Sequence, residues 1–258
     1  MNTLLRSFVQ GGIVVAIFIT PFFASAATFT IADGDVQGLI NAINTANSTN
    51  APDTINLASG GTYISTTTNN ATFGNNAFPT ITSKVTFNGN GSTIQRSTAI
   101  GTPPFRFFAV NAPKGDLTIN NVTLSGGRGS GAIKNLSKTE IVGSIISNNV
   151  SPSSGGGGLS NSGSGKLKIV ESTVTNNTAA AGGGGIINSS GDLTVVNSTI
   201  SSNTASYAGG GIASVNFGAK VAITNSTISG NTTGTRGQGE GVYNTTFSNL
   251  KFSNSTIV

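Results

Sequence analysis

Apolar residues recur at fixed places along the second half of this chain. The segment 192–203 reads DLTVVNSTISSN and the segment 220–231 reads KVAITNSTISGN, so the second halves are nearly identical and the first halves keep apolar residues at their second and fourth positions. Looser copies, and one last copy, begin at Asp116, Lys138, Lys166 and Leu250. A repeat of this kind is typical of a solenoid, in which each unit buries its apolar face only against its neighbours.

Alignment of the copies yields three series of apolar residues. The first series is Ile119, Ile141, Ile169, Val195, Ile223 and Phe252. The second, five residues further on, is Leu124, Ile146, Val174, Ile200, Ile228 and Ile257. The third is Ile133, Leu159, Ile186, Ile212 and Val242. Three short strands in each repeat, with no helical stretch between them, predict an all-β, right-handed parallel β-helix of about 26–29 residues per coil, whose coils stack at ~4.8 Å.

Within one coil the alternation of side chains also indicates strands. Leu193 and Val195 alternate with Thr194 and Val196, so one face points inward, and Ser198 and Ile200 form the next inward pair. This change of parity requires a bend near Asn197, as expected at a corner between two strands.

Two further features of the repeat suit turns. Asn149, Asn177, Asn203 and Asn231 occupy one equivalent turn position. Asparagine tolerates left-handed backbone, and stacked amides can form a ladder along the axis, so we predict a structural ladder rather than a binding site. Glycine runs at 155–158, 182–185 and 209–211 precede the third strand. They suit turns with positive φ or close backbone approach, and no helix follows that would complete a phosphate site.

The N-terminal segment 1–26 is predicted to be a secretion signal. Arg6 supplies its positive charge, 13–19 its apolar core, and Ala24-Ser25-Ala26 a cleavage site. The alternative is a retained membrane anchor, which Pro21 and two glycines interrupt. We therefore expect a secreted or cell-surface protein with no membrane span after the signal is removed.

Residues 27–60 depart from the repeat and predict an N-terminal cap of strand, helix and strand. The strands are expected at 28–31 and 54–57, and the helix follows Asp35, which suits an N-cap. Its apolar stripe is Val36, Leu39, Ile40, Ile43 and Ala46. Such a helix would cover the first coil, as terminal caps do in solenoids.

The β-helix is predicted to occupy 61–258. Irregular first coils are expected at 80–85 and 92–95, with four phenylalanines to fill the core: Phe78, Phe87, Phe105 and Phe107. At the other end, 255–258 stops within a strand pair and leaves an open edge. We interpret the chain as a fragment of a longer product; the alternative is self-association through this uncapped coil.

Composition narrows the chemistry. Charged residues make up 8% of the chain, and there are 36 glycines. This composition alone would also fit a flexible linker, but a linker has no reason to place apolar residues at fixed positions in each repeat. The absence of cysteine excludes disulfides and thiolate metal sites. The absence of histidine excludes a Ser-His-Asp relay. The net charge is +5, or +4 once Arg6 is removed with the signal.

Several segments resemble known secreted proteins. The segments 39–47 (LINAINTAN) and 53–57 (DTINL) resemble the N-terminal cap of bacterial β-helix proteins of the CSLREA type, although the cysteine, arginine and acid of that motif are missing here. The segments 78–83 and 88–94 resemble first coils of such proteins. The repeats are similar to those of polymorphic outer-membrane proteins and other adhesin-like chains. The resemblance covers nearly all of 27–258 and implies the pectate-lyase-like fold and a place at the cell surface, but no particular ligand.

Because that fold also carries polysaccharide lyases and hydrolases, an enzyme is the alternative to weigh. All the acids are Asp33, Asp35, Asp53, Asp116, Glu140, Glu171, Asp192 and Glu240. Glu140 and Glu171 are the best candidates for a carboxylate pair, since both are expected in first strands of successive coils. They are offset in the alignment, however, and solvated surface acids are the plainer interpretation.

A calcium-dependent lyase would need clustered aspartates, which the repeats do not contain. Asp33-Gly-Asp35 has the composition of a cation loop, but a turn followed by a helix cap is the better interpretation. We therefore expect no catalytic residue, no metal and no cofactor.

The lysines suggest a binding surface. Lys138, Lys168, Lys220 and Lys251 lie near the start of successive first strands, with Lys166 as an alternative to Lys168. They predict a basic stripe that faces acidic polysaccharide or cell-surface glycan, while solubility and edge protection are the alternative. Nucleic acid is a poor partner because no aromatic residues are interleaved with the lysines.

A threonine face is the remaining idea. Thr199 and Thr227 align, with Thr123 and Thr256 at equivalent places. One threonine per coil, without a paired rank, argues against binding to ice or a crystal surface. The sequence thus favours a non-catalytic, adhesin-like display protein, with a carbohydrate-active enzyme or its remnant as the alternative and a structural spacer as a third possibility.

Overall fold

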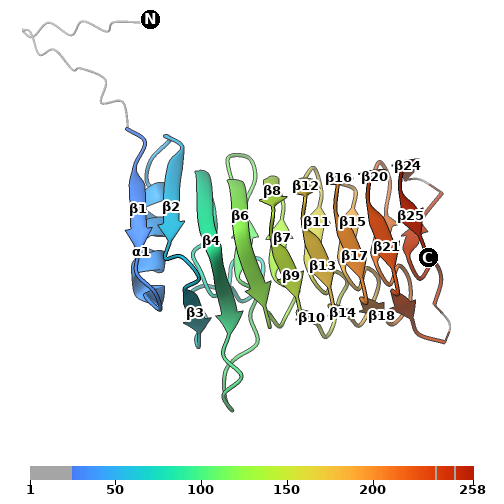
Figure 1. The fold of residues 1–258 in the computed structure, drawn as a ribbon, viewed down its shortest axis with the longest axis horizontal. Helices are drawn as coiled ribbons and strands as arrows, with labels where there is room; N and C mark the ends of the chain where they lie inside the picture. Colours follow the sequence, from blue (N-terminus) through green and yellow to red (C-terminus); the bar gives the residue numbers. More distant parts are fainter. Residues whose placement is uncertain (1–24, 236, 247) are drawn as a thin grey trace, which may run out of the picture.

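The computed structural model describes residues 25–235, 237–246 and 248–258, and its coils follow one another along a single axis (Figure 1). The signal peptide predicted at 1–26 lies outside the described residues apart from its last two positions. In the part of the chain that the structure describes, no helix has the length and apolar character needed to cross a membrane. The parallel β-helix predicted from the repeat is confirmed.

Each regular coil contributes two strands to one large sheet of 15 strands, here called the main sheet. Its first strands are β6 (Asp116–Ser125), β8 (Lys138–Val142), β12 (Lys166–Val170), β16 (Asp192–Val196), β20 (Lys220–Thr224) and β24 (Asn249–Ser253). Its second strands are β9 (Ile145–Ser147), β13 (Thr173–Thr175), β17 (Thr199–Ser201), β21 (Thr227–Ser229) and β25 (Thr256–Ile257). The long strand β6 pairs with both β8 and β9. The part of the main sheet that is a single strand in the coil of β6 is therefore two separate strands in the next coil.

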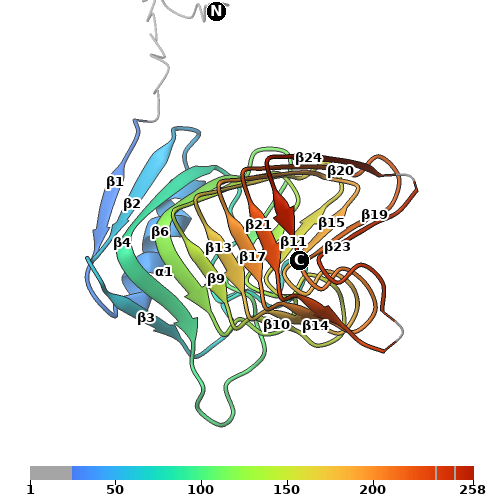
Figure 2. The ribbon, with the colours of Figure 1, turned by 45° about the vertical axis from the view of Figure 1, so that its right-hand side comes forward.

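Two smaller sheets close each coil (Figure 2). The six-stranded back sheet comprises β5 (Phe108–Val110), β7 (Ile133–Asn135), β11 (Leu159–Ser162), β15 (Ile186–Ser189), β19 (Ile212–Val215) and β23 (Val242–Asn244). The small sheet comprises β10 (Val150–Ser151), β14 (Thr178–Ala179), β18 (Thr204–Ala205) and β22 (Thr232–Thr233). Three strands per coil were predicted; this fourth, two-residue strand was missed because a segment so short has no alternation to reveal it.

The strand register confirms the three apolar series. Ile141 lies opposite Ile119 and Ile169, Ile146 opposite Leu124 and Val174, and Leu159 opposite Ile133 and Ile186. All of these side chains are at most 1% exposed. Like residues therefore stack on like residues along the axis, and each coil completes the core of its neighbours.

The corner after the first strand explains the change of parity. Asn197 has φ 50°, and its equivalents Asn121, Gly143, Glu171, Asn225 and Asn254 also have positive φ. One residue in this conformation turns the chain without a loop, so Val195 and Ser198 both point inward. The predicted bend near Asn197 is confirmed.

The helix is found where the sequence predicts it. α1 (Val36–Asn47) lies at one end of the solenoid (Figure 1), between β1 (Thr28–Ile31) and β2 (Asp53–Leu57). Asp35 caps it by accepting a 2.7 Å hydrogen bond from Gly38 N. Its inward face is Leu39, Ala42, Ile43 and Ala46.

The first coils differ in detail from the prediction. β3 (Thr62–Ser65) pairs with one long strand, β4 (Lys84–Arg96), in place of the two separate strands expected near 80–85 and 92–95. A register irregularity between Asn88 and Ser92 bends β4 where the later coils have their corner. The four phenylalanines expected in the core are at most 1% exposed.

Candidate functional site

The outward residues of the first strands form two charged rows on the main sheet. Since Leu167 and Ile169 point inward, Lys166 and Lys168 of β12 point outward. Register then fixes their neighbours along the axis. The first row is Lys84, Asp116, Lys138, Lys166, Asp192 and Lys220. The second row is Glu140, Lys168, Thr194, Ala222 and Lys251.

Three ion pairs join neighbouring strands in these rows. Lys138 Nζ lies 2.9 Å from Asp116 Oδ2, Lys168 Nζ 2.9 Å from Glu140 Oε1, and Lys220 Nζ 3.5 Å from Asp192 Oδ1. The lysine side chains are 52–68% exposed. Water therefore screens the pairs, and each contributes well under about 1 kcal/mol to folding.

The lysines of the predicted stripe all lie on the main sheet, but in two rows rather than one. Lys138 lies opposite Lys166, whereas Lys168 lies opposite Glu140. Lys138 and Lys220 thus belong to the first row, and Lys168 and Lys251 to the second. The alignment left Lys166 and Lys168 as alternatives, and hydrogen-bond register allows only one of them opposite Lys138.

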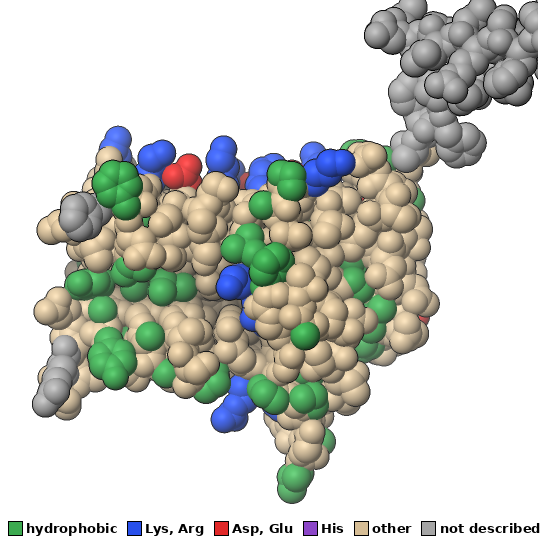
Figure 3. Space-filling model, turned by 180° about the vertical axis from the view of Figure 1, so that it is seen from behind, with side chains coloured by type: hydrophobic (Ala, Val, Ile, Leu, Met, Phe, Trp, Pro, Cys, Tyr) green, Lys and Arg blue, Asp and Glu red, His purple; other side chains and the backbone are tan. Residues whose placement is uncertain are grey.

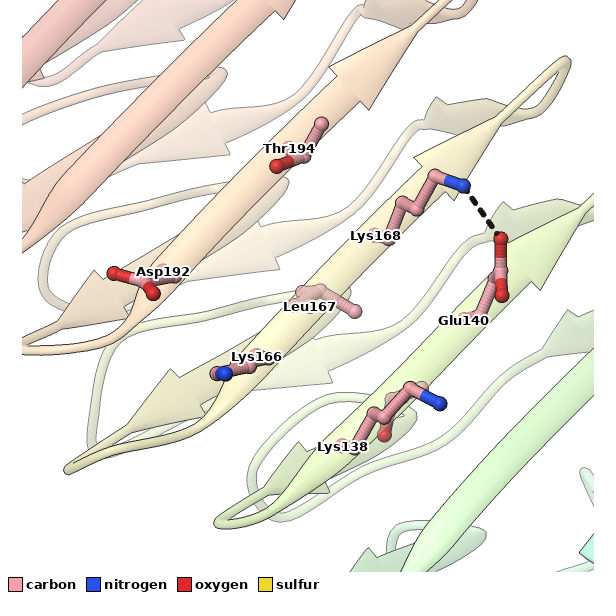
Figure 4. A pocket seen from close by; sticks show the side chains of 8 residues that line it. Lys138, Glu140, Lys166, Leu167, Lys168, Asp192 and Thr194 are labelled. Carbon is pink, nitrogen blue, oxygen red and sulfur yellow. Dashed lines mark hydrogen bonds and ion pairs between the residues drawn. The ribbon is translucent and has the colours of Figure 1, made fainter.

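A shallow depression of about 280 Å³ lies over β8, β12 and β16. Its polar lining residues are Lys138, Thr139, Glu140, Lys166, Lys168, Asp192 and Thr194. Figure 4 shows Lys168 reaching toward Glu140, while Lys166 lies on the neighbouring part of β12. Among the described residues Lys166 has no carboxylate within ion-pair distance. Its three N–H donors are therefore available to an anionic group.

The two acids of the depression each pair with a lysine. Glu140 of β8 pairs with Lys168 of β12, whereas Asp192 of β16 pairs with Lys220 of β20, on its far side from Glu140. The backbones of Glu140 and Asp192 are two strands and two residues apart, a separation of about 12 Å.

The other predicted carboxylate, Glu171, is not in a first strand. It occupies the corner after β12 with φ 50°, at the position equivalent to Gly143. The structure therefore does not set Glu140 and Glu171 side by side on one strand face. Within the described residues there is no group of three or more acidic, histidine or cysteine side chains that could hold a metal ion. At Asp33-Gly-Asp35, Asp33 Oδ1 accepts from Thr62 N at 2.6 Å and Asp35 caps α1, so both acids serve the backbone.

The predicted asparagine positions stack in the interior. Asn149 Nδ2 donates to Asn177 Oδ1 at 3.0 Å, Asn177 Nδ2 to Asn203 Oδ1 at 2.9 Å, and Asn203 Nδ2 to Asn231 Oδ1 at 2.9 Å. Their side chains are at most 4% exposed, so they offer nothing to a ligand.

The backbone at this turn differs from the expectation. The left-handed residues are those one position earlier, namely Asn148, Asn176, Ser202 and Gly230, with φ between 55° and 58°. The buried asparagines were expected to make the turn themselves; instead they satisfy buried backbone groups inside it. Asn177 Nδ2, for example, also donates to Ile146 O at 2.9 Å.

Two further ladders were missed. Asn135 Nδ2 donates to Asn161 Oδ1, and Asn161 Nδ2 to Asn188 Oδ1, both at 2.7 Å. Serines form the other ladder at the first corner: Ser144, Ser172, Ser198, Ser226 and Ser255 each accept from a backbone N–H of the preceding coil at 3.1–3.2 Å. The recurrence of both sets at coil spacing was visible in the sequence and is the signal that would have found them.

The outward face of the second strands carries two rows of hydroxyl groups. One row is Thr173, Thr199, Thr227 and Thr256, and the other is Thr175, Ser201 and Ser229. The expectation of a single threonine per coil holds except in the coil with Thr173 and Thr175, and the serines of the second row were not considered in it. Ile145 interrupts the first row next to Thr173.

Comparison with known proteins bears on the architecture. A protein-family model described as "Right handed beta helix region" matches residues 108–258. No curated protein matches the chain. The matched residues include the whole of the depression and all four asparagines of the first ladder.

Proposed function

Since the chain belongs to the right-handed β-helix family, we propose that it is a secreted or cell-surface protein that binds acidic glycan on the two charged rows of the main sheet and does not cleave it. One observation carries this proposal. The two rows together hold six lysines, at 84, 138, 166, 168, 220 and 251, against three carboxylates, at 116, 140 and 192.

The excess of positive charge lies along one edge of the molecule. Figure 3 shows basic side chains in a row along this edge, interrupted by acidic ones. Successive strands are ~4.8 Å apart, so an extended polyanion that runs along the axis meets a cation at most steps. A long, rigid sheet keeps these cations in place and limits the entropy lost on binding.

The acids in the rows have a role in this arrangement. They neutralise Lys138, Lys168 and Lys220 in the free protein, and an incoming carboxylate or sulfate group competes with them for the same ammonium groups. Binding should therefore be weak for each sugar unit, sensitive to salt, and dependent on many units acting together. Display of a polar ladder to a glycan or another cell is the adhesin-like role that fits this behaviour.

The test is co-sedimentation of the purified chain with insoluble acidic and neutral polysaccharides at several salt concentrations. A triple variant, Lys138→Gln, Lys166→Gln and Lys168→Gln, removes the cations of the depression. A matched control, Lys114→Gln, removes one exposed lysine that lies in neither row and whose Nζ bonds Asn50 Oδ1 at 3.3 Å. We expect retention on acidic polysaccharide to fall at least tenfold in the triple variant and to be unchanged in the control.

The same incubations separate binding from catalysis. Ultraviolet absorbance reports unsaturated products of a lyase, and a reducing-end assay reports hydrolysis. Products that form with the wild type and disappear in the triple variant would overturn the non-catalytic proposal in favour of a carbohydrate-active enzyme. Equal retention of the triple variant and the wild type would overturn the assignment of the binding face.

A further inference from the structure

A second group of cations lies away from the charged rows, beside the back sheet. Arg106 comes just before β5, and its side chain is buried, with only 3% of the residue exposed. Nη2 donates to Phe73 O at 2.8 Å. Nε and Nη1 have no hydrogen-bond partner among the described residues. A buried guanidinium normally has a carboxylate or several carbonyl groups around it, because its desolvation is otherwise costly.

Lys134 is a second cation on this face. It lies in β7 of the back sheet, opposite Ser160 of β11 and opposite Ala109 of β5, which follows Arg106 by three residues, and it is partly exposed. Burial, and then the positive charge of Arg106, lower the pKa of Lys134. Burial also lowers the pKa of Arg106. Register thus places two partly or fully desolvated cations in neighbouring coils of one face.

No acid of the described residues compensates this pair. The ion pairs in that part of the chain involve Lys138, Lys168 and Lys220, which all belong to the main sheet. Figure 3 looks at the side of the molecule where the back sheet lies, and it shows a hollow on this face with basic side chains within it. The hollow is bordered by polar and hydrophobic surface rather than by acidic side chains.

The loop over Arg106 is shaped to hold the guanidinium in place. Phe73 and Gly74 have φ 58° and 108°, and a Cβ at Gly74 would come within 2.5 Å of Nη2. The backbone therefore lies directly on the guanidinium and has no room for a side chain. Arg106 is fixed and covered, whereas the ammonium of Lys134 is the part of the pair that a ligand can reach.

We propose that Arg106 and Lys134 form a binding site for a single oxyanion, a carboxylate or sulfate group, on the back-sheet face. The anion contacts the ammonium of Lys134 directly. The buried charge of Arg106 holds it there through a medium of low dielectric, in which charges attract more strongly than in water. This site is separate from the charged rows of the main sheet and goes beyond the glycan binding proposed for them.

The experiment is a calorimetric titration of the full chain at constant ionic strength with sodium sulfate, sodium galacturonate, sodium glucuronate and uncharged galactose, each compared with sodium chloride. The variants are Lys134→Gln, Arg106→Gln and Lys134→Arg. Lys114→Gln is the matched control, because it removes one exposed lysine that belongs neither to the charged rows nor to this site. A parallel nuclear magnetic resonance titration follows the pKa of the Lys134 amine with and without the anion.

We expect saturable binding of at least one of the anions and none of galactose. Lys134→Gln should weaken it about tenfold or more, the effect of losing one charged hydrogen bond. Lys134→Arg should retain most of the affinity, Lys114→Gln all of it, and the bound anion should raise the pKa of Lys134. Saturation by sulfate identifies a general oxyanion site, and saturation by a uronate alone identifies a sugar carboxylate.

Other results would overturn the proposal. These are no saturable binding of any anion, equal affinity in the wild type and Lys134→Gln, or equal losses in Lys134→Gln and Lys114→Gln. If Arg106→Gln does not fold, Lys134→Gln still decides the question, since Lys134 is partly exposed and makes no hydrogen bond in the described residues. A failure here leaves retention on polysaccharide by the charged rows intact, because the two experiments use different faces and different variants.

Discussion

Replacement of Asn203 by alanine should destabilise the chain by several kcal/mol although the residue touches no ligand. Asn203 is fully buried, and its side chain takes part in four hydrogen bonds. Nδ2 donates to Val174 O and to Asn231 Oδ1, both at 2.9 Å, and Oδ1 accepts from Asn177 N at 3.0 Å and Asn177 Nδ2 at 2.9 Å. Alanine would remove all four, although Asn231 Oδ1 would still accept from Asn203 N and Asn177 Nδ2 would still donate to Ile146 O.

The magnitude follows from those four lost hydrogen bonds. Each contributes about 1 kcal/mol net, and a buried group that keeps no other partner costs about 1–3 kcal/mol. The space vacated by the amide can admit one water molecule, which would satisfy some of them. We therefore expect a loss of about 4 kcal/mol for Asn203→Ala, a large part of the stability of an ordinary domain.

Urea unfolding followed by far-ultraviolet circular dichroism measures this loss, provided that the slope of the transition stays unchanged. The control is Thr204→Ala, the adjacent residue, whose exposed hydroxyl exchanges one 3.0 Å hydrogen bond with Thr232. It should cost less than about 0.5 kcal/mol. If Asn203→Ala costs no more than Thr204→Ala, the interior ladder does not stabilise the fold and the reasoning fails.

Three further predictions rest on other contacts. Ser214 lies between Asn188 and Asn244 in the back sheet, and its buried hydroxyl has no hydrogen-bond partner among the described residues. Ser214→Asn should therefore complete the second asparagine ladder and raise the urea midpoint by an amount equivalent to about 1 kcal/mol. A lower midpoint would show that the space does not fit an amide. A double-mutant cycle with Glu140→Gln and Lys168→Gln should give a coupling energy below about 1 kcal/mol that shrinks with added salt, and a larger, salt-independent value would contradict the solvent screening argued above. Burial raises the pKa of Tyr63 above its ordinary value of about 10, so its contribution to stability is complete below that pH and is lost as the pH rises through the folded-state pKa. Unfolding of the wild type and Tyr63→Phe between neutral and strongly alkaline pH should therefore converge at high pH, and parallel curves would refute the assignment.

The fold could be predicted in some detail because, in a solenoid, the spacing of the repeated apolar residues indicates which residues of neighbouring coils lie opposite one another. Ile141, Ile169 and Val195 had to stack once their spacing was recognised, since only translation by whole coils buries all of them. The cap of the first helix was equally local, because Asp35 and the stripe that follows it need no distant partner. The two-residue strands were not predictable in this way, since Thr178 and Ala179 become a strand only through pairing with their neighbours.

The candidate site was predicted less well, for a physical reason. Which of Lys166 and Lys168 lies opposite Lys138 depends on a shift of two residues that leaves every inward side chain apolar, so hydrophobic patterning does not decide it. The cations at Arg106 and Lys134 lie 28 residues apart in a region of irregular coils, and only the loop at Phe73 brings the first of them into the interior. The hydrophobic pattern of a sequence predicts which apolar side chains are buried, but it does not predict the position of an unpaired charged side chain.

The first asparagine ladder also gives the solenoid a direction. Every amide oxygen from Asn149 to Asn203 accepts hydrogen bonds from the preceding coil, and every Nδ2 donates both to the amide oxygen of the following coil and to a backbone carbonyl of the preceding one. The amide groups are consequently oriented the same way along the axis. A duplicated coil inserted in the same orientation would find both of its neighbours already complementary, whereas an inverted one would set oxygen against oxygen. Proteins of this architecture can therefore change length by gain or loss of whole coils, and the row of lysines on the outside would lengthen in step with the ladder within.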